Sequence, residues 1–303
     1  MNWVFLAVIS AALQAVGLVI KKHALRVGGM NDIVAFFVFA SAGIVLATIY
    51  WLLHGMLLQE SVFSLRLWWD IFVATFFTIL GVVFSYRALD MADVSYLSPY
   101  SVCGVFVTAI IAFFIVGEIP TAWQFVGMSI IALGSIVMEY RAHNNLSHAD
   151  RQKISRNRAA LVLFFTSVFF YSIPPAWQKD AVLVTEDALF VAYVTHVAIA
   201  IAFVIIVLVR GGFRRMNDVA HTMPAQHFVL WTVAAGVVAA GANGSAYIAF
   251  VSGPVAPIIA LKRLAPLFTF LLGVYIFHES LHLRRKLLAT ILMVCGAILV
   301  ALG

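Results

Sequence analysis

Two adjacent cations, Lys262 and Arg263, lie inside the apolar run VAPIIALKRLAPLFTFLLGVYIF, residues 255–277. A helix with a rise of about 1.5 Å per residue places Lys262 about 10 Å in from Val255, well inside a hydrocarbon layer of ~30 Å. Each cation costs about 2.5–3.5 kcal/mol there, so the pair requires a watery cavity or an anion. The pattern predicts half of an anion site, with a bidentate grip from Arg and a point charge from Lys. The alternative is structural, with both cations bonded to backbone carbonyls or extended toward the interface.

The acidic residues favour the anion site, because none is predicted at the depth of Lys262. All thirteen carboxylates lie at or beyond the ends of the predicted helices. Glu118 and Glu279 are interpreted as residues of helix termini, where the helix dipole favours negative charge. The pattern argues against a proton-coupled pump for cations, which needs a membrane-embedded carboxylate.

The composition predicts the elements that position the pair. Hydrophobic residues make up 64% of the 303 residues and charged residues 11%, and the mean hydropathy is +1.04. An all-α polytopic membrane protein is therefore predicted. The first apolar run has no cleavage site after it and is interpreted as a spanning helix. Ten transmembrane helices are predicted near residues 3–20, 33–53, 67–88, 94–117, 121–140, 159–178, 188–209, 227–250, 255–277 and 285–302.

An internal repeat organises these helices. The basic, polar linker 141–158 separates two halves of five helices each, residues 1–140 and 159–303. A shift of 161 residues (279 minus 118) aligns Glu118 with Glu279, and a shift of 157 aligns Lys22 with Lys179 near the start of each half. Because each half has an odd number of helices, the second enters the membrane in the opposite orientation. Two inverted repeats are therefore predicted, as in alternating-access transporters.

Basic residues concentrate on one side of the predicted membrane. The loops on that side hold fifteen Lys and Arg residues, whereas the other side has two, Arg66 and Lys179. The positive-inside rule places the linker 141–158 in the cytoplasm and both termini outside it. Since the excess charge of +6 follows the helix ends, no nucleic-acid role is predicted.

Two paired segments carry a resemblance to a known family. FFIVGEIPTAWQFVGMSIIALGSIVM and VYIFHESLHLRRKLLATILMVCGAILV resemble the C-terminal portions of the two halves of drug/metabolite transporters of the EamA type. The resemblance covers nearly the whole chain. It implies a carrier of small metabolites with a central cavity lined by the first, third, fourth, sixth, eighth and ninth helices.

Lys262 and Arg263 are also similar to a Lys-Arg pair in sugar-phosphate and phosphate translocators of the same superfamily. The pair lies seventeen and sixteen residues before the position of Glu279, as in those carriers. That similarity implies that the two cations hold a substrate phosphate. The carriers place a further lysine in the fourth helix, where this sequence has Ser101, so less charge is available here.

Other polar residues are predicted to line the cavity. Ser101 aligns with Lys262 and is expected to face the same cavity from the first half. Pro174 and Pro175 predict a break in the sixth helix. His196 either titrates near neutral pH or bonds to a neighbouring helix. The remaining candidate substrate-binding residues are Tyr96, Tyr100, Tyr171, Asn243, Tyr247 and Gln14.

Together these patterns predict a secondary-active transporter of a phosphorylated or carboxylated metabolite that works by alternating access. An exporter of amino acids or neutral metabolites, and a lipid-linked phosphate flippase, remain alternatives. No H-E-x-x-H or G-x-S-x-G motif is present, so an enzyme is not predicted, and no cofactor or metal is expected. The expected partners are a small-molecule substrate and membrane lipids, with the chain a monomer or homodimer. The expected location is the bacterial inner (plasma) membrane.

Overall fold

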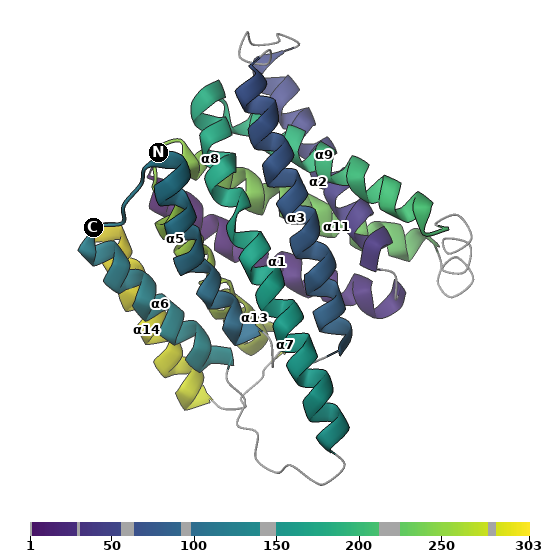
Figure 1. Cartoon of the computed structure of the whole chain (residues 1–303). Coiled ribbons are helices and arrows are strands. Elements are labelled where there is room, and N and C mark those ends of the chain that lie inside the picture. The colour runs from purple at the N-terminus through teal and green to yellow at the C-terminus, as the bar shows by residue number, and fades with distance from the viewer. Residues whose placement is uncertain are drawn as a thin grey trace. The chain divides into compact units, whose positions relative to one another are not determined.

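This computed structural model describes residues 2–28, 31–55, 64–91, 98–139, 150–211, 225–277 and 283–303 (Figure 1). The described residues form helices and no strand, in ten segments, three of which are interrupted. The continuous segments are α1 (Trp3–Gly28), α2 (Asn31–His54), α3 (Leu65–Met91), α6 (Ala122–Glu139), α9 (Ala188–Val209), α11 (Ala225–Phe250) and α14 (Leu283–Leu302). The interrupted segments are η2 (Ser98–Val102) with α5 (Cys103–Val116), α7 (Asp150–Ser172) with α8 (Pro174–Thr185), and α12 (Val255–Lys262) with α13 (Ala265–Phe277).

Length and composition suit these segments to a bilayer. Within the described ranges, five spans are long and apolar enough to cross a membrane, and four shorter helices are also apolar. Large apolar side chains such as Leu52 and Phe114 are exposed, as expected for surfaces that face lipid. The long spans are Asp32–His54, Leu65–Ser85, Arg158–Thr185, Ala188–Val209 and Gln226–Phe250.

Proline explains the interruption between α7 and α8. Pro174 and Pro175 lack the N–H groups that would continue α7, and proline is well tolerated in the first turn of the new helix α8. The break predicted in the sixth helix is therefore confirmed. That helix, however, begins at Asp150 and ends at Thr185, not at the predicted 159 and 178, so residues 150–158 of the expected linker are helical.

The described helices divide into two compact units, each of which combines parts of both sequence halves. Unit 1 comprises residues 1–76 and 177–253, and unit 2 comprises residues 77–176 and 254–303. In unit 1, α2 packs on α9 and α11, and α1 packs on α11. In unit 2, α6 packs on α14 and α5 packs on α12.

Equivalent helices of the two repeats lie side by side. The shift of 161 residues carries α6 onto residues 283–300, within α14, and Figure 1 shows this pair in contact. Glycine permits the close approach: a Cβ on Gly127 would lie 2.6 Å from the carbonyl oxygen of Gly296, and a Cβ on Gly296 would lie 2.7 Å from that of Gly127.

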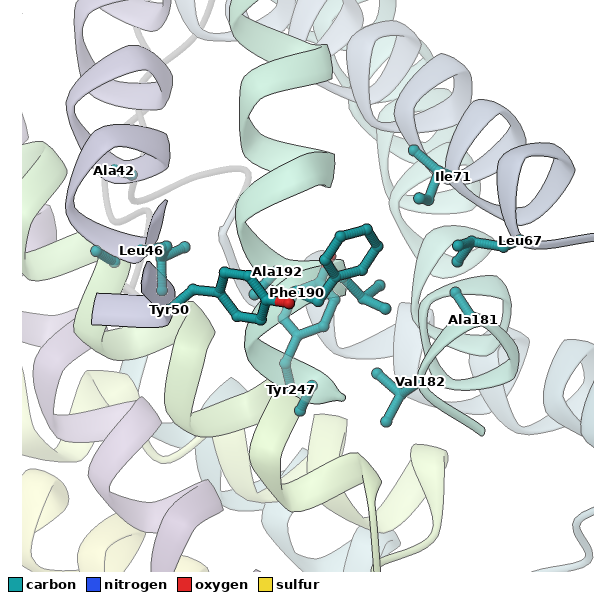
Figure 2. Packing of buried hydrophobic residues seen from close by; sticks show 13 residues of the cluster. Ala42, Leu46, Tyr50, Leu67, Ile71, Ala181, Val182, Phe190, Ala192 and Tyr247 are labelled. Carbon is teal, nitrogen blue, oxygen red and sulfur yellow. The ribbon is translucent and has the colours of Figure 1, made fainter. Parts of the chain in front are cut away.

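The core of unit 1 is built around aromatic residues from three helices (Figure 2). The rings of Tyr50 and Phe190 lie 5.7 Å apart, edge to face, and Tyr247 is buried in the same cluster. Leu67 of α3 packs with Val182 of α8 at the other side of the cluster. This core therefore joins the first turns of α3 to α8.

Candidate functional site

Lys262 and Arg263 lie at the interruption between α12 and α13. The predicted continuous helix 255–277 is wrong at this point, because α12 ends at Lys262 and α13 begins at Ala265. Pro266 has no N–H to donate to the carbonyl of Lys262, so the α-helical ladder stops there. The N–H groups of Arg263 and Leu264 instead bond three residues back, to the carbonyls of Ala260 (2.9 Å) and Leu261 (3.0 Å).

The interruption releases a backbone carbonyl, and a neighbouring helix satisfies it. The N–H of Leu267 bonds to the carbonyl of Leu264 at 2.9 Å, so the carbonyl of Arg263 has lost its usual helical donor. Ser135 of α6 donates its hydroxyl to that oxygen at 3.1 Å. The backbone of the cation pair is thereby tied to α6.

The Arg263 guanidinium lies against the first turn of α5. A Cβ on Gly104 would be 3.5 Å from Nη2 of Arg263 and 3.0 Å from Oγ of Ser172. Ser172 donates to the carbonyl of Gly104 at 3.1 Å, and Thr108 donates to the carbonyl of Ser172 at 3.2 Å. The ends of α7 and α12 and the start of α5 therefore meet beside Arg263. Helix ends of this kind supply polar backbone at membrane depth, where transporters bind ions and substrates.

Glu118 holds the other end of α12. Its Oε2 accepts a hydrogen bond of 2.7 Å from the N–H of Val255, the first residue of α12. The interpretation of Glu118 as a helix-terminus residue is right in kind, and the helix terminus that its carboxylate serves is that of α12. A carboxylate there satisfies an orphan donor and complements the helix dipole. The short helix is thus anchored at its first residue by Glu118 and just after its last by Ser135.

The other sequence candidates of unit 2 surround this junction in different ways. Tyr100 packs edge-on against Phe165 of α7, with ring centres 5.4 Å apart. Ser101 is half-buried in η2, whose residues align with 259–263 of the second repeat. Tyr171 is 39% exposed, and its ring lies on Gly81, where a Cβ would be only 2.9 Å away. Their roles in binding stay predictions, and Tyr96 lies outside the described residues.

Four of the polar candidates, including His196, belong to unit 1. Asn243 donates its amide to Nε2 of His196 at 3.1 Å, while Nδ1 of His196 lies 2.7 Å from the carbonyl of Ala192. With the Asn243 amide as donor, the ring proton lies on Nδ1, and the histidine is bonded to a neighbouring helix. Tyr247 is 3% exposed within the core of Figure 2. Gln14 of α1 is half-buried, and its Oε1 accepts no hydrogen bond from the described residues. Substrate contacts by these residues stay predictions.

A second charged cluster, which was not predicted from the sequence, lies in unit 1. Arg66 donates to both oxygens of Asp180, from Nε to Oδ2 at 3.1 Å and from Nη2 to Oδ1 at 2.8 Å and to Oδ2 at 2.9 Å. Asp70, one turn beyond Arg66 on α3, interacts with both groups. Next to Asp180 in the chain, Lys179 donates to the carbonyl of Gly253 at 2.7 Å.

The expectation that carboxylates lie at or beyond helix ends is therefore wrong for Asp70 and Asp180. Each lies five residues inside its helix, about 7.5 Å from the end. They are 1% and 7% exposed. The spacing of Arg66 and Asp70, four residues apart, was a readable signal of a charged helix face. For Asp180 the signal was hidden, because the predicted helix ended before it.

Comparison with known families identifies the fold. The sequence matches the EamA-like transporter family over residues 1–140 and 158–302. The chain belongs to the EamA-like transporter family. It is accordingly an integral membrane transporter, built from the two repeats that the sequence predicts. Members of the EamA-like family are transporters and not enzymes.

A solved structure supports the EamA-like fold, although it does not identify a substrate. A chain described as "Crystal structure of protein" superposes with a TM-score of 0.73 at 16% sequence identity. The match covers 99% of this chain and 95% of that chain. No curated protein matches the sequence.

Proposed function

We propose that this EamA-like transporter carries a small phosphorylated or carboxylated metabolite by alternating access, and that Lys262 and Arg263 bind the anionic group. One observation carries the proposal. Lys262 is the last residue of a helix that is interrupted within an apolar segment, and no described carboxylate forms an ion pair with it. An anion supplied by the substrate would neutralise a charge that is otherwise costly at such a position.

The geometry of the junction suits a preorganised anion site. Glu118 and Ser135 hold α12 and the Arg263 backbone, so little conformational entropy remains to be lost when a ligand binds. The guanidinium rests beside Gly104, which leaves room for a planar fork to approach phosphate or carboxylate oxygens. The resemblance to phosphate translocators favours a phosphate ester among these anions.

A structural role for Lys262 is the competing explanation, and it has a specific basis. The residue lies in the last turn of α12, where the helix dipole favours a cation. If that is its whole role, the transporter would carry neutral metabolites and would respond weakly to changes at Lys262. The test must therefore separate ligand binding from stability.

The experiment compares thermal shifts of the purified protein with phosphorylated sugars and with the same sugars lacking phosphate. A ligand at about 100 times its dissociation constant stabilises by ~2.7 kcal/mol. Lys262→Gln should weaken binding of the phosphorylated form by about 1.5–3 kcal/mol, the worth of a charged hydrogen bond. Arg263→Lys should also weaken binding, because the charge remains while the planar fork is lost.

Lys179→Gln is the control, since it removes a buried cation that donates to a backbone carbonyl. This variant should lower the melting temperature and keep the ligand-induced shift. Lys262→Gln should show the reverse pattern. If Lys262→Gln lowers stability and leaves the ligand shift unchanged, the cation pair is structural and the anion proposal fails.

We further propose that the transporter lies in the bacterial inner membrane with residues 141–158 in the cytoplasm, on the basis of the loop charges. In a variant without Cys103 and Cys295, a cysteine at Gly303 should react with an impermeant reagent in intact cells. A cysteine at Ser147 should not react. The opposite labelling pattern would reverse the orientation.

A further inference from the structure

Asp70 is a buried carboxyl group that lacks hydrogen-bond donors. Its exposed fraction is 1%, and neither carboxyl oxygen accepts a hydrogen bond from any donor in the described ranges. A carboxylate buried without donors is strongly unfavourable, far more so than the neutral acid. The carboxyl group of Asp70 interacts instead with another carboxyl group, that of Asp180.

Arg66 does not supply the missing donors: its Nε and Nη2 groups bond to Asp180, and no N–H group of Arg66 bonds to Asp70. Nε and Nη2 make three contacts of 2.8–3.1 Å with the two Asp180 oxygens. Two carboxyl groups thus share one cation, whose side chain is 64% exposed. If both carboxyls were ionised, they would repel each other with a single positive charge between them.

The surroundings of Asp70 exclude water on the side of the core. Leu67 and Ile71, on either side of it along α3, pack in one cluster with Ala181 and Val182 of α8 (Figure 2). On the outer side, Arg66 lines an open hollow of about 800 Å³ with Trp68, Trp69 and Phe72. The ion pair is therefore open to the surface at Arg66, whereas the carboxyl group of Asp70 is buried.

Titratable groups on the other elements of this cluster are engaged elsewhere. Nε2 of His54 on α2 lies 3.7 Å from Asp187 at the start of α9, and Lys179 on α8 donates to the carbonyl of Gly253. The remaining titratable residues packed here are the tyrosines of the aromatic core, Tyr50, Tyr193 and Tyr247. None of these groups is a donor to Asp70 within the described structure.

We propose that Asp70 and Asp180 together bind one exchangeable proton. A proton on Asp70 makes that carboxyl a donor, and the ionised Asp180 beside it is the acceptor. The cluster of Arg66, Asp180 and protonated Asp70 has no net charge, whereas loss of the proton leaves a net charge of about −1 on these three groups. In a transporter, such a site supplies a coupling ion, and its two carboxyls come from different repeats, on α3 and α8.

Infrared spectroscopy of the purified protein tests proton binding directly and needs no substrate. The wild type should show the carbonyl band of a protonated carboxylic acid at neutral pH, and the band should disappear as the pH is raised. Asp70→Asn, which keeps the shape of the neutral acid, should lack the band. Asp32→Asn is the matched control, because Asp32 is also buried but lies 3.9 Å from Arg210, and it should retain the band.

The pH dependence of thermal unfolding gives a second readout. If the folded state holds a proton that the unfolded chain releases, stability must fall as pH rises from mildly acidic to neutral. The wild type should show this fall with a slope of about one proton, and Asp70→Asn should lack that component. Absence of a protonated-acid band in the wild type overturns the proposal even if the variant fails to fold. Because neither readout uses a ligand, failure here is distinct from failure of the anion proposal.

Discussion

The two charged regions differ in how their cations are neutralised. In unit 1, Arg66 is bound to Asp180 by three short contacts, and a second carboxyl group, Asp70, lies beside the pair. In unit 2, Lys262 ends a short helix and forms no ion pair with the carboxylates that the structure describes. A region with an excess of acid is suited to binding a proton, whereas a region with an excess of base is suited to binding an anion.

The backbone beneath the two regions differs as well. Asp70 and Asp180 lie within unbroken turns of α3 and α8, so their backbone groups are satisfied within the helices. Lys262 and Arg263 lie where α12 stops, and a carbonyl released there is satisfied by Ser135 of another helix. Substitutions in unit 1 should therefore act mainly through charge. Substitutions in unit 2 should act through both charge and helix packing.

The largest effect should come from placing a carboxylate in the proposed anion site. Lys262→Glu removes a charged hydrogen bond worth about 1.5–3 kcal/mol and adds repulsion, so anion affinity should fall by at least about 100-fold. The new carboxylate should also attract Arg263. Thermal shifts with the anion that stabilises the wild type provide the measurement. Unchanged affinity would show that the site lies elsewhere.

The next effect concerns packing around Arg263. Gly104→Val places a branched side chain where even a Cβ would be 3.0 Å from Ser172 and 3.1 Å from Val168. Overpacking of this kind typically costs about 1–3 kcal/mol, measured as a loss of thermal stability, and ligand affinity should fall as Arg263 is displaced. Gly17→Ala is the control, since its Cβ would meet Val238 at an ordinary 3.5 Å. Equal losses in the two variants would exclude a special role for Gly104.

A smaller effect is expected at the carbonyl that the helix interruption releases. Ser135→Ala removes the donor to the carbonyl of Arg263 and should cost about 1 kcal/mol of stability. Ser129→Ala on the same helix removes an exposed hydrogen bond to the carbonyl of Phe125. This variant should have little effect, because the carbonyl of Phe125 lies within a continuous helix and keeps its backbone donor. Thermal unfolding of both variants checks the difference. Similar melting temperatures would mean that the released carbonyl needs no side-chain donor.

The smallest effect should follow the most exposed substitution in unit 1. Arg66→Lys keeps the charge opposite Asp180 and loses the fork geometry, so stability should fall slightly, and less so at high salt. The same change at Arg263 should weaken ligand binding instead. Unfolding at low and high ionic strength measures the first effect. A loss at Arg66 that exceeds the loss in Ser135→Ala would mean that the ion pair is a main support of α3 and α8.

The sequence anticipated features that depend on local chemistry. As far as the described residues extend, each of the ten apolar runs corresponds to one helical segment, and Pro174 with Pro175 marked the interruption between α7 and α8. Pro266 carried the same signal for the ninth helix, but the apolar run around it concealed the break. The resemblance to EamA-type carriers also anticipated the family, because the repeated segments that carry it are contiguous in the sequence.

Other features could not be read from neighbouring residues. Glu118 bonds to a residue 137 positions away, and Ser135 to one 128 positions away, so no local pattern pairs them. Asp180 was expected beyond a helix end, whereas α8 extends past it and packs against α3. Helix boundaries shift in this way when tertiary burial stabilises turns that local hydrophobicity does not mark.

Composition, apolar run length and the internal repeat by themselves determined that this chain is a ten-helix membrane protein with a duplicated plan. These properties depend on the cost of placing unpaired polar backbone groups in lipid. Each helical segment avoids that cost through its own internal hydrogen bonds. The tertiary structure alone decided which charged and polar groups lie next to one another. Whether Asp70 meets a donor or another acid, and which side chain accepts the N–H that begins α12, depends on helices that are distant in sequence and adjacent in space.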